Sequence, residues 1–226
     1  MAFVLDSVVP WGRSFAEYVR MFGLTEELQL KIASCGDGPA SFNCEMNARG
    51  GRVVSCDPIY QFSGEQLRGR IEDSFEKVMA ETRKNEGNFV WDIIKSPDEL
   101  GRVRMEATER FLDDYESGRA EGRYLAESLP SLPFGDNEFD LALCSHFLFL
   151  YSQQLSLDFH RQAVAEMCRV AREVRIFPLI DLDLNKSGYV PVICSEMRTA
   201  GFEVEIQKVS YEFQRGGNEM MKIRRP

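Results

Sequence analysis

The chain has 226 residues, of which 44% are hydrophobic and 28% charged, and its formal net charge is -9 at pH 7. This length suits one domain with a sizeable insertion, and no stretch is apolar over the ~18 residues that a membrane span needs. The negative charge disfavours general binding of nucleic acid, because neutralising phosphates requires clustered Lys and Arg.

The cysteines and the opening segment indicate a cellular setting. The six cysteines form no Cys-x-x-Cys pair and have no histidine at metal-ligand spacing. The opening segment, MAFVLDSVVPWGRS, lacks the basic region of a secretory signal peptide. We therefore expect a cytoplasmic protein without a bound metal.

Residues 14–57 predict the beginning of an α/β fold. Residues 14–22 place their apolar side chains on one helical stripe. A buried strand (31–35), a glycine-rich turn, a helix and a second strand (51–57) follow in that order. Such a βαβ unit has two parallel strands.

Residues 61–122 differ from the rest because they are strongly charged and show no strand pattern. Ser63 and Ser96 both stand at clear helix starts. We predict two long helices, at about 64–85 and 97–117. The segment is interpreted as a helical insertion that forms a lid or part of the wall of an acceptor pocket.

The α/β pattern resumes after the insertion. Strands are predicted at 123–127, 139–145, 173–180, 202–209 and 213–223, with helices at 157–171 and 187–200. The whole chain is therefore expected to form one Rossmann-like α/β domain. Its sheet would be mostly parallel and seven-stranded, with helices on both faces, an antiparallel last strand and the insertion after the second strand.

The turn after the first strand is the candidate ligand site. Ligands of open α/β sheets bind at the carboxyl ends of strands, and Gly36 and Gly38 allow close approach of the backbone. Asp57 closes the second strand, where an acid commonly accepts hydrogen bonds from a ribose. Asp37 would repel a pyrophosphate, whereas S-adenosyl-L-methionine carries a sulfonium and an ammonium. The residues favour that ligand. They leave open an NAD-dependent oxidoreductase and a non-catalytic nucleoside-binding or interaction module.

Three segments carry a family resemblance. IASCGDGPA resembles the first motif of class I S-adenosylmethionine-dependent methyltransferases, with Gly36, Gly38 and Ala40 at its three glycine positions. VVSCD resembles the second motif. LPSLPFGDNEFDLALCSHFLF is similar to the segment after the third strand in members that act on small molecules. Two positions depart from the pattern, since Ser34 replaces an acid and Ala40 replaces a glycine.

The resemblance implies methyl transfer to a small or medium-sized acceptor. It places the methionyl part of the cofactor at the glycine turn, the ribose at Asp57 and the transferable methyl near the end of the fourth strand. The cofactor contacts that it implies are Ser34, Cys35, Gly36, Asp37, Gly38, Asp57, Pro58, Ile59, Glu127, Ser128, Cys144 and Ser145. Arg13, ahead of the first strand, is a candidate to bind the cofactor's carboxylate.

Methyl transfer by in-line displacement depends mainly on holding the reactants at ~3–3.5 Å, so no dedicated base is required. Where an acceptor must lose a proton, His146 at the end of the fourth strand is the candidate base. The alternative is that His146 only shapes the following loop. His160 is expected on a surface-like helix and is given no role. Phe89, Val90 and Trp91 are expected to form the apolar contact of the insertion.

Overall fold

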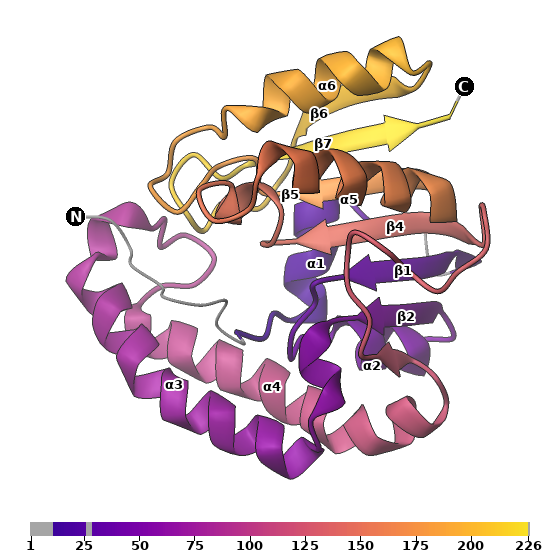
Figure 1. Ribbon diagram of the computed structural model, residues 1–226. Helices are drawn as coiled ribbons and strands as arrows, with labels where there is room; N and C mark the ends of the chain where they lie inside the picture. The colour runs from indigo at the N-terminus through magenta and orange to yellow at the C-terminus, as the bar shows by residue number, and fades with distance from the viewer. Residues whose placement is uncertain (1–10, 26–28, 226) are drawn as a thin grey trace.

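A seven-stranded sheet, in the order β3-β2-β1-β4-β5-β7-β6, organises the computed structural model, which describes residues 11–25 and 29–225 (Figure 1). The strands are β1 (Lys31–Cys35), β2 (Arg52–Cys56), β3 (Tyr124–Leu125), β4 (Phe139–Ser145), β5 (Ala171–Phe177), β6 (Glu203–Lys208) and β7 (Glu219–Arg224). β7 is antiparallel to both of its neighbours, and every other adjacent pair is parallel. The predicted Rossmann-like sheet with an antiparallel last strand is confirmed. The expectation for the opening segment falls mainly on residues 1–10, outside the described residues.

Helices cover both faces of this sheet. The α-helices are α1 (Phe15–Phe22), α2 (Phe42–Ala48), α3 (Gly64–Lys84), α4 (Pro97–Ala120), α5 (Leu157–Val170) and α6 (Tyr189–Thr199), and short 3-10 helices are η2 (Pro58–Gln61), η3 (Glu86–Asn88) and η4 (Phe149–Tyr151). α5 and α6 lie on one face, and α1 and α2 lie on the other (Figure 1). Side chains of β1 alternate between the two cores, with Ile32 facing α1 and α2 and Ala33 facing α5. Within the described residues no helix is long and apolar enough to cross a membrane.

The helical insertion is present where the sequence predicts it, as α3 and α4. The hydroxyls of Ser63 and Ser96 accept hydrogen bonds from backbone N–H groups in the first turns of these helices, as their patterns predict. α4 continues past the predicted end to Ala120. The third strand is shorter than the predicted 123–127, because as an edge strand β3 pairs only with the last two residues of β2.

An aromatic cluster joins the insertion to the edge of the sheet. Tyr60, Phe111, Tyr115 and Tyr124 are all at least 98% buried and in ring-to-ring contact with one another. The Tyr115 hydroxyl lies 2.8 and 2.9 Å from the carbonyl oxygens of Tyr60 and Phe62, which follow β2, and its one hydrogen is shared between them. The insertion therefore shares a core with the α/β domain.

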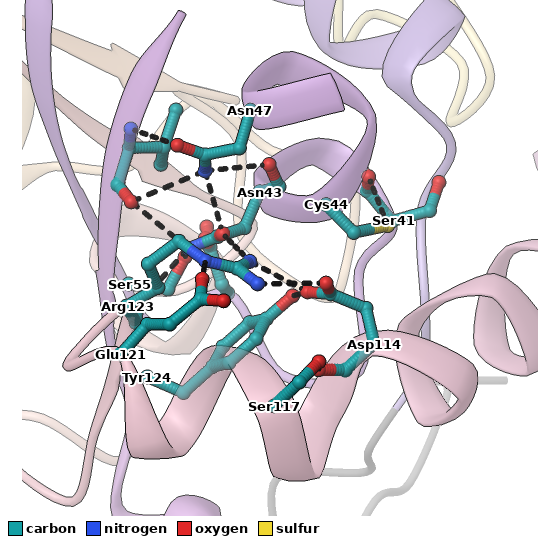
Figure 2. A network of polar contacts seen from close by, with 12 residues as sticks. Ser41, Asn43, Cys44, Asn47, Ser55, Asp114, Ser117, Glu121, Arg123 and Tyr124 are labelled. Atoms are coloured by element: carbon teal, nitrogen blue, oxygen red, sulfur yellow. Dashed lines mark hydrogen bonds and ion pairs between the residues drawn. The ribbon is translucent and has the colours of Figure 1, made fainter.

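A polar network beside this cluster fixes α4 to α2 (Figure 2). The Arg123 guanidinium donates to both carboxylate oxygens of Asp114 on α4, at 2.6 and 2.7 Å. It also donates to the side-chain oxygen of Asn43 on α2, at 3.0 Å. The hydroxyl of Tyr124 completes the group by donating to Asp114. These bonds hold α4 at the β3 edge.

The far end of the insertion is bonded to the connection between β6 and β7. Val90 N–H donates to Phe213 O at 2.8 Å, and Arg215 N–H donates to Asn88 O at 2.9 Å. The Trp91 ring meets the Phe213 ring edge-on, with centroids 5.5 Å apart. The insertion therefore runs past the carboxyl ends of the central strands and is held at both of its ends (Figure 1).

Phe111→Ala should lower the free energy of unfolding by about 3–5 kcal/mol, because it removes the fully buried ring at the centre of the aromatic cluster. Urea denaturation measures the loss. Ile93→Ala, at a side chain that is 38% exposed, is the control and should change stability by no more than about 0.5 kcal/mol. Equal effects of the two substitutions would show that the insertion is not part of the core.

Candidate active site

A cavity of about 280 Å³ lies at the carboxyl ends of β1, β2 and β4. Its lining comes from the glycine turn after β1, from the loops after β2 and β4, and from residues 11 and 13. The insertion and the β6–β7 connection supply the opposite wall. The site thus lies at the place expected of an α/β fold, and the insertion and the β6–β7 connection close it from the other side.

Most of the predicted site residues line this cavity. They are Arg13, Gly36, Asp37, Gly38, Asp57, Pro58, Ile59, Ser128, Ser145 and His146. Ser34, Cys35 and Cys144 lie beside the site but are buried in β1 and β4, because central parallel strands point their side chains into the two cores. Glu127 is exposed and outside the lining, since β3 ends before it.

The glycine turn has a backbone that only glycine adopts easily. Gly36 and Gly38 have φ angles of 71° and 57°. A Cβ atom on Gly36 would lie 3.1 Å from the Phe147 side chain, whereas one on Gly38 would meet nothing within 4 Å. The Tyr60 hydroxyl supports the turn by donating to Gly38 O at 2.8 Å. The backbone at Gly38 is therefore open to a ligand.

Asp57 joins the end of β2 to this turn. One carboxylate oxygen accepts the Gly38 N–H at 2.8 Å, and the other accepts the Ile59 N–H at 2.9 Å. Burial raises the pKa of Asp57 to about 6, and the two backbone hydrogen bonds oppose that rise. Each oxygen keeps a further lone pair, so the carboxylate can accept hydrogen bonds from a ligand as well.

Asp37 lies within the turn, and its carboxylate points down toward the strands. One oxygen accepts the hydroxyls of Tyr18, at 2.7 Å, and of Ser34. The other accepts the Ser55 hydroxyl at 2.6 Å. Burial raises the pKa of Asp37, while the three hydroxyls act in the opposite direction. An acidic side chain thus lies beside Ser34, the position at which the family resemblance would have an acid.

His146 borders the cavity in a strained backbone conformation, with a φ angle of 50°. Its N–H donates to Phe177 O at 2.7 Å, and its Nδ1 lies 3.0 Å from the Ser145 hydroxyl. Burial, together with the positive charges of Arg13 and Arg104, lowers the pKa of His146 well below its usual range. The imidazole is therefore neutral at pH 7.

His160 is not on the surface, contrary to the sequence-based expectation. Its side chain is fully buried, and its ring nitrogens lie 2.8 and 2.9 Å from the carbonyl oxygens of Ser156 and Leu148. Because Leu148 belongs to the loop after β4, His160 shapes that loop from beneath.

Sequence reasoning missed Arg104 on α4. Its side chain is 1% exposed, lines the cavity and forms an ion pair with Glu17 at 2.5 Å. Glu17 also accepts the hydroxyl of Tyr211 at 2.7 Å. A signal was present, since Arg104 lies four residues after the apolar Leu100 and seven before Phe111, on the buried stripe of an amphipathic helix.

The strand order, the antiparallel β7 and the glycine turn after β1 define a class I methyltransferase-like Rossmann fold. The chain is 36% identical over 225 residues to the uncharacterized protein MJ0045 of Methanocaldococcus jannaschii, with 98% of each chain covered. It belongs to the same family as that protein. No protein-family model matches the chain.

Solved structures with a similar course of the chain include several methyltransferases. One is magnesium protoporphyrin IX methyltransferase from Synechocystis PCC 6803 with bound SAM, with 13% identity, coverage of 94% of this chain and 78% of that one, and a TM-score of 0.48. Another is 1,6-didemethyltoxoflavin-N1-methyltransferase from Burkholderia thailandensis, with 14% identity, coverage of 87% of this chain and 71% of that one, and a TM-score of 0.44. A SAM-dependent methyltransferase from Methanosarcina mazei has 12% identity, coverage of 90% of this chain and 95% of that one, and a TM-score of 0.46. The fold assignment rests on the strand order and not on these scores.

Tyr18→Phe should destabilise the protein more at pH 8 than at pH 4. The Tyr18 hydroxyl stabilises the charged form of Asp37, so its removal raises a pKa that burial has already raised. At pH values above the pKa of Asp37 in the folded protein, the substitution should lower the free energy of unfolding by about 1.5–3 kcal/mol. This loss shrinks at lower pH, where Asp37 is protonated. Urea unfolding at the two pH values measures it.

Tyr189→Phe is the matched control for this substitution, because the Tyr189 hydroxyl has no hydrogen-bond partner in residues 11–25 and 29–225. It should change stability by no more than about 0.5 kcal/mol at either pH. A loss in Tyr18→Phe that is the same at pH 8 and pH 4 would contradict the role given to the hydroxyl.

Proposed function

We propose that the protein transfers a methyl group from S-adenosyl-L-methionine to a small or medium-sized acceptor, and that the cavity holds both molecules. The observation that carries this proposal is the link between Asp57 and Gly38. It places a hydrogen-bond acceptor for a ribose directly beside an open glycine backbone. Such a pair suits a nucleoside ligand.

The residues around this pair fit the remaining parts of the cofactor. Pro58, Ile59 and Ser128 line the cavity next to Asp57 and would contact the adenine. Asp37 lies under the turn, where three hydroxyls stabilise its charged form, and that form would favour a sulfonium and an ammonium over a pyrophosphate. The cofactor would supply a methyl carbon already activated by its sulfonium, so the protein's task is to position the acceptor.

Arg13 is the proposed partner of the cofactor's carboxylate. Its carbonyl oxygen accepts the Ser41 N–H at 3.0 Å, directly after the glycine turn. Gly12 allows this approach, because a Cβ atom there would lie 2.4 Å from Pro39 O. The Arg13 Nε is buried and finds no hydrogen-bond acceptor within the described part of the chain. A carboxylate would satisfy it.

The acceptor side of the cavity is mainly apolar. Phe147, Leu150 and Leu182 line it from the α/β domain, and Phe89 and Leu100 line it from the insertion. These walls would exclude water and orient the acceptor. In this proposal the insertion is an acceptor wall. Since it also completes the core, its role must be tested by point substitutions and not by deletion.

His146 is kept as the candidate base for acceptors that must lose a proton. Its low pKa makes the neutral imidazole available at pH 7, and the adjacent Ser145 hydroxyl orients the ring. A weak base of this kind accepts a proton only as the acceptor's bond to carbon forms, and releases it readily afterwards. An acceptor that is already nucleophilic does not need it.

The wild-type protein should bind S-adenosylhomocysteine, and Asp57→Ala should weaken that binding by roughly 10- to 100-fold, as expected for lost hydrogen bonds to a charged group. Isothermal titration calorimetry measures both. Asp73→Ala, at an exposed acid on α3, is the control and should bind as the wild type does. Binding of NADH in place of S-adenosylhomocysteine would favour the oxidoreductase alternative, and binding of neither would favour a non-catalytic module.

Affinity for S-adenosylhomocysteine should fall as the pH is lowered through about 6. Above that pH the Asp57 carboxylate is charged and accepts the ribose hydroxyls, and below it the group is protonated. The ligand should therefore lower the pKa of Asp57 and release protons when it binds near pH 6. Titrations from pH 5 to pH 8 test this expectation. Asp57→Asn should abolish the dependence, and a wild-type affinity that is constant over this range would contradict it.

A further inference from the structure

The guanidinium of Arg104 is buried in the wall of the cavity with only part of its hydrogen-bonding capacity used. Its Nη1 bonds to Glu17, but its Nε and Nη2 find no acceptor in the described part of the chain. The side chain is 1% exposed. Unpaired buried N–H groups destabilise a protein, and each such group in a native structure asks for an explanation.

Gln214 adds a second unpaired polar group to the same cavity. Its side-chain oxygen is buried and has no partner within residues 11–25 and 29–225. It is held there by the bridge between Phe89 and Gln214, which bonds the insertion to the β6–β7 connection. The Arg104 guanidinium lies 5.9 Å from the ring centroid of neighbouring Phe213. An amide that can rotate and a guanidinium therefore share one apolar-walled region.

Two cations, Arg13 and Arg104, and two acids, Asp37 and Asp57, line the cavity. The acids lie at the glycine turn and at the end of β2, on the cofactor side, whereas on the other side Glu17 pairs with Arg104 and His146 is neutral. Burial and the nearby Arg104 lower the pKa of Arg13, and the negative charge of Glu17 acts in the opposite direction. What remains unused on this side is the pair of Arg104 donors, Nε and Nη2, which an anionic ligand group would accept.

The order of residues along α4 separates Arg104 from the cofactor end. A Cβ atom on Gly12 would lie 2.9 Å from the Thr108 hydroxyl and 2.4 Å from Pro39 O, so Thr108 lies close to the glycine turn. Arg104 is one helical turn further from that point, and Leu100 is one turn beyond Arg104. Arg13 is thus the cation nearer the cofactor, and Arg104 faces the acceptor side.

We infer that the methyl acceptor is an amphipathic anion, whose carboxylate or phosphate accepts the free N–H groups of Arg104 and those of the Gln214 amide, once that amide has turned its nitrogen toward the ligand. The apolar body of the acceptor packs against Phe89, Leu100 and Phe213. This inference rests on the proposed function, since it names the acceptor class for the same site. The planar fork of an arginine suits both carboxylate and phosphate, and a charge-assisted hydrogen bond in a buried site is strong.

The test compares benzoate with benzamide, which have the same ring and differ in charge. Both are titrated by calorimetry into the protein, once alone and once saturated with S-adenosylhomocysteine. Benzoate should bind at least about tenfold more tightly than benzamide in the saturated protein. Phenyl phosphate, titrated in the same way, distinguishes a phosphate from a carboxylate preference.

In two variants this preference should nearly vanish, so that the affinities for benzoate and benzamide differ by no more than about twofold. Gln214→Leu removes a side chain whose oxygen has no protein partner, so it should fold normally. The double variant Arg104→Met with Glu17→Gln removes the guanidinium without leaving a buried charge unpaired. Arg102→Met, at the 59% exposed arginine on the same helix, should keep the full preference. If the double variant fails to fold, the benzoate preference measured in Gln214→Leu tests the inference by itself.

Three results would overturn the inference: no preference for benzoate in the wild type, a preference that survives in the folded variants, or weaker binding of S-adenosylhomocysteine but not of 5′-methylthioadenosine in the double variant. The last would show that Arg104 binds the cofactor's carboxylate, which methylthioadenosine lacks. A benzoate preference that the variants abolish in a protein that never binds S-adenosylhomocysteine would leave the anion site standing and refute the methyltransferase proposal instead.

Discussion

The site depends on one carboxylate, that of Asp57, which bonds the end of β2 to the turn at the end of β1. Parallel pairing of β1 with β2 brings the two strand ends to the same edge of the sheet, and the Gly38 N–H then completes the connection. Asp37 stabilises the turn from below by receiving three hydroxyls. The position of the open backbone is thus fixed from two sides before any ligand arrives, which reduces the ordering that a ligand must impose.

The second half of the cavity is made by the insertion, and its construction explains why the segment has a dual role. Its base shares the aromatic cluster around Phe111 with the α/β domain, and its tip bonds to the β6–β7 connection. Between these two anchors, α4 presents Arg104 and Leu100 to the cavity. Because α4 both completes a core and lines the cavity, substitutions that alter ligand preference without disturbing the core are confined to its few cavity-facing residues.

Sequence patterns predicted the fold well, since they act locally. The βαβ unit, the capped starts at Ser63 and Ser96 and the antiparallel last strand all follow from periodicity and turn chemistry. The positions of Gly36, Gly38 and Asp57 also followed, because a strand end is visible in the sequence. Side-chain direction was less accessible: Cys144 and Glu127 were placed near the site, yet one faces the core and the other faces solvent.

What the sequence did not show are contacts between distant segments. Arg104 and Glu17 are 87 residues apart, and Gln214 reaches the cavity only through its pairing with Phe89. His160 was expected on the surface, since its helix carries many charged residues, but it points to the loop after β4. Each of these depends on how the insertion and the loops fold back over the strand ends, which local patterns do not specify.

A crystal structure of the protein grown with S-adenosylhomocysteine tests the central claim most directly. The account predicts the nucleoside at the carboxyl ends of β1 and β2, with both ribose hydroxyls within about 2.6–3.2 Å of the Asp57 carboxylate and the homocysteine end over the glycine turn. A structure in which the nucleoside lies elsewhere, or in which Asp57 makes only its two backbone contacts, would contradict it.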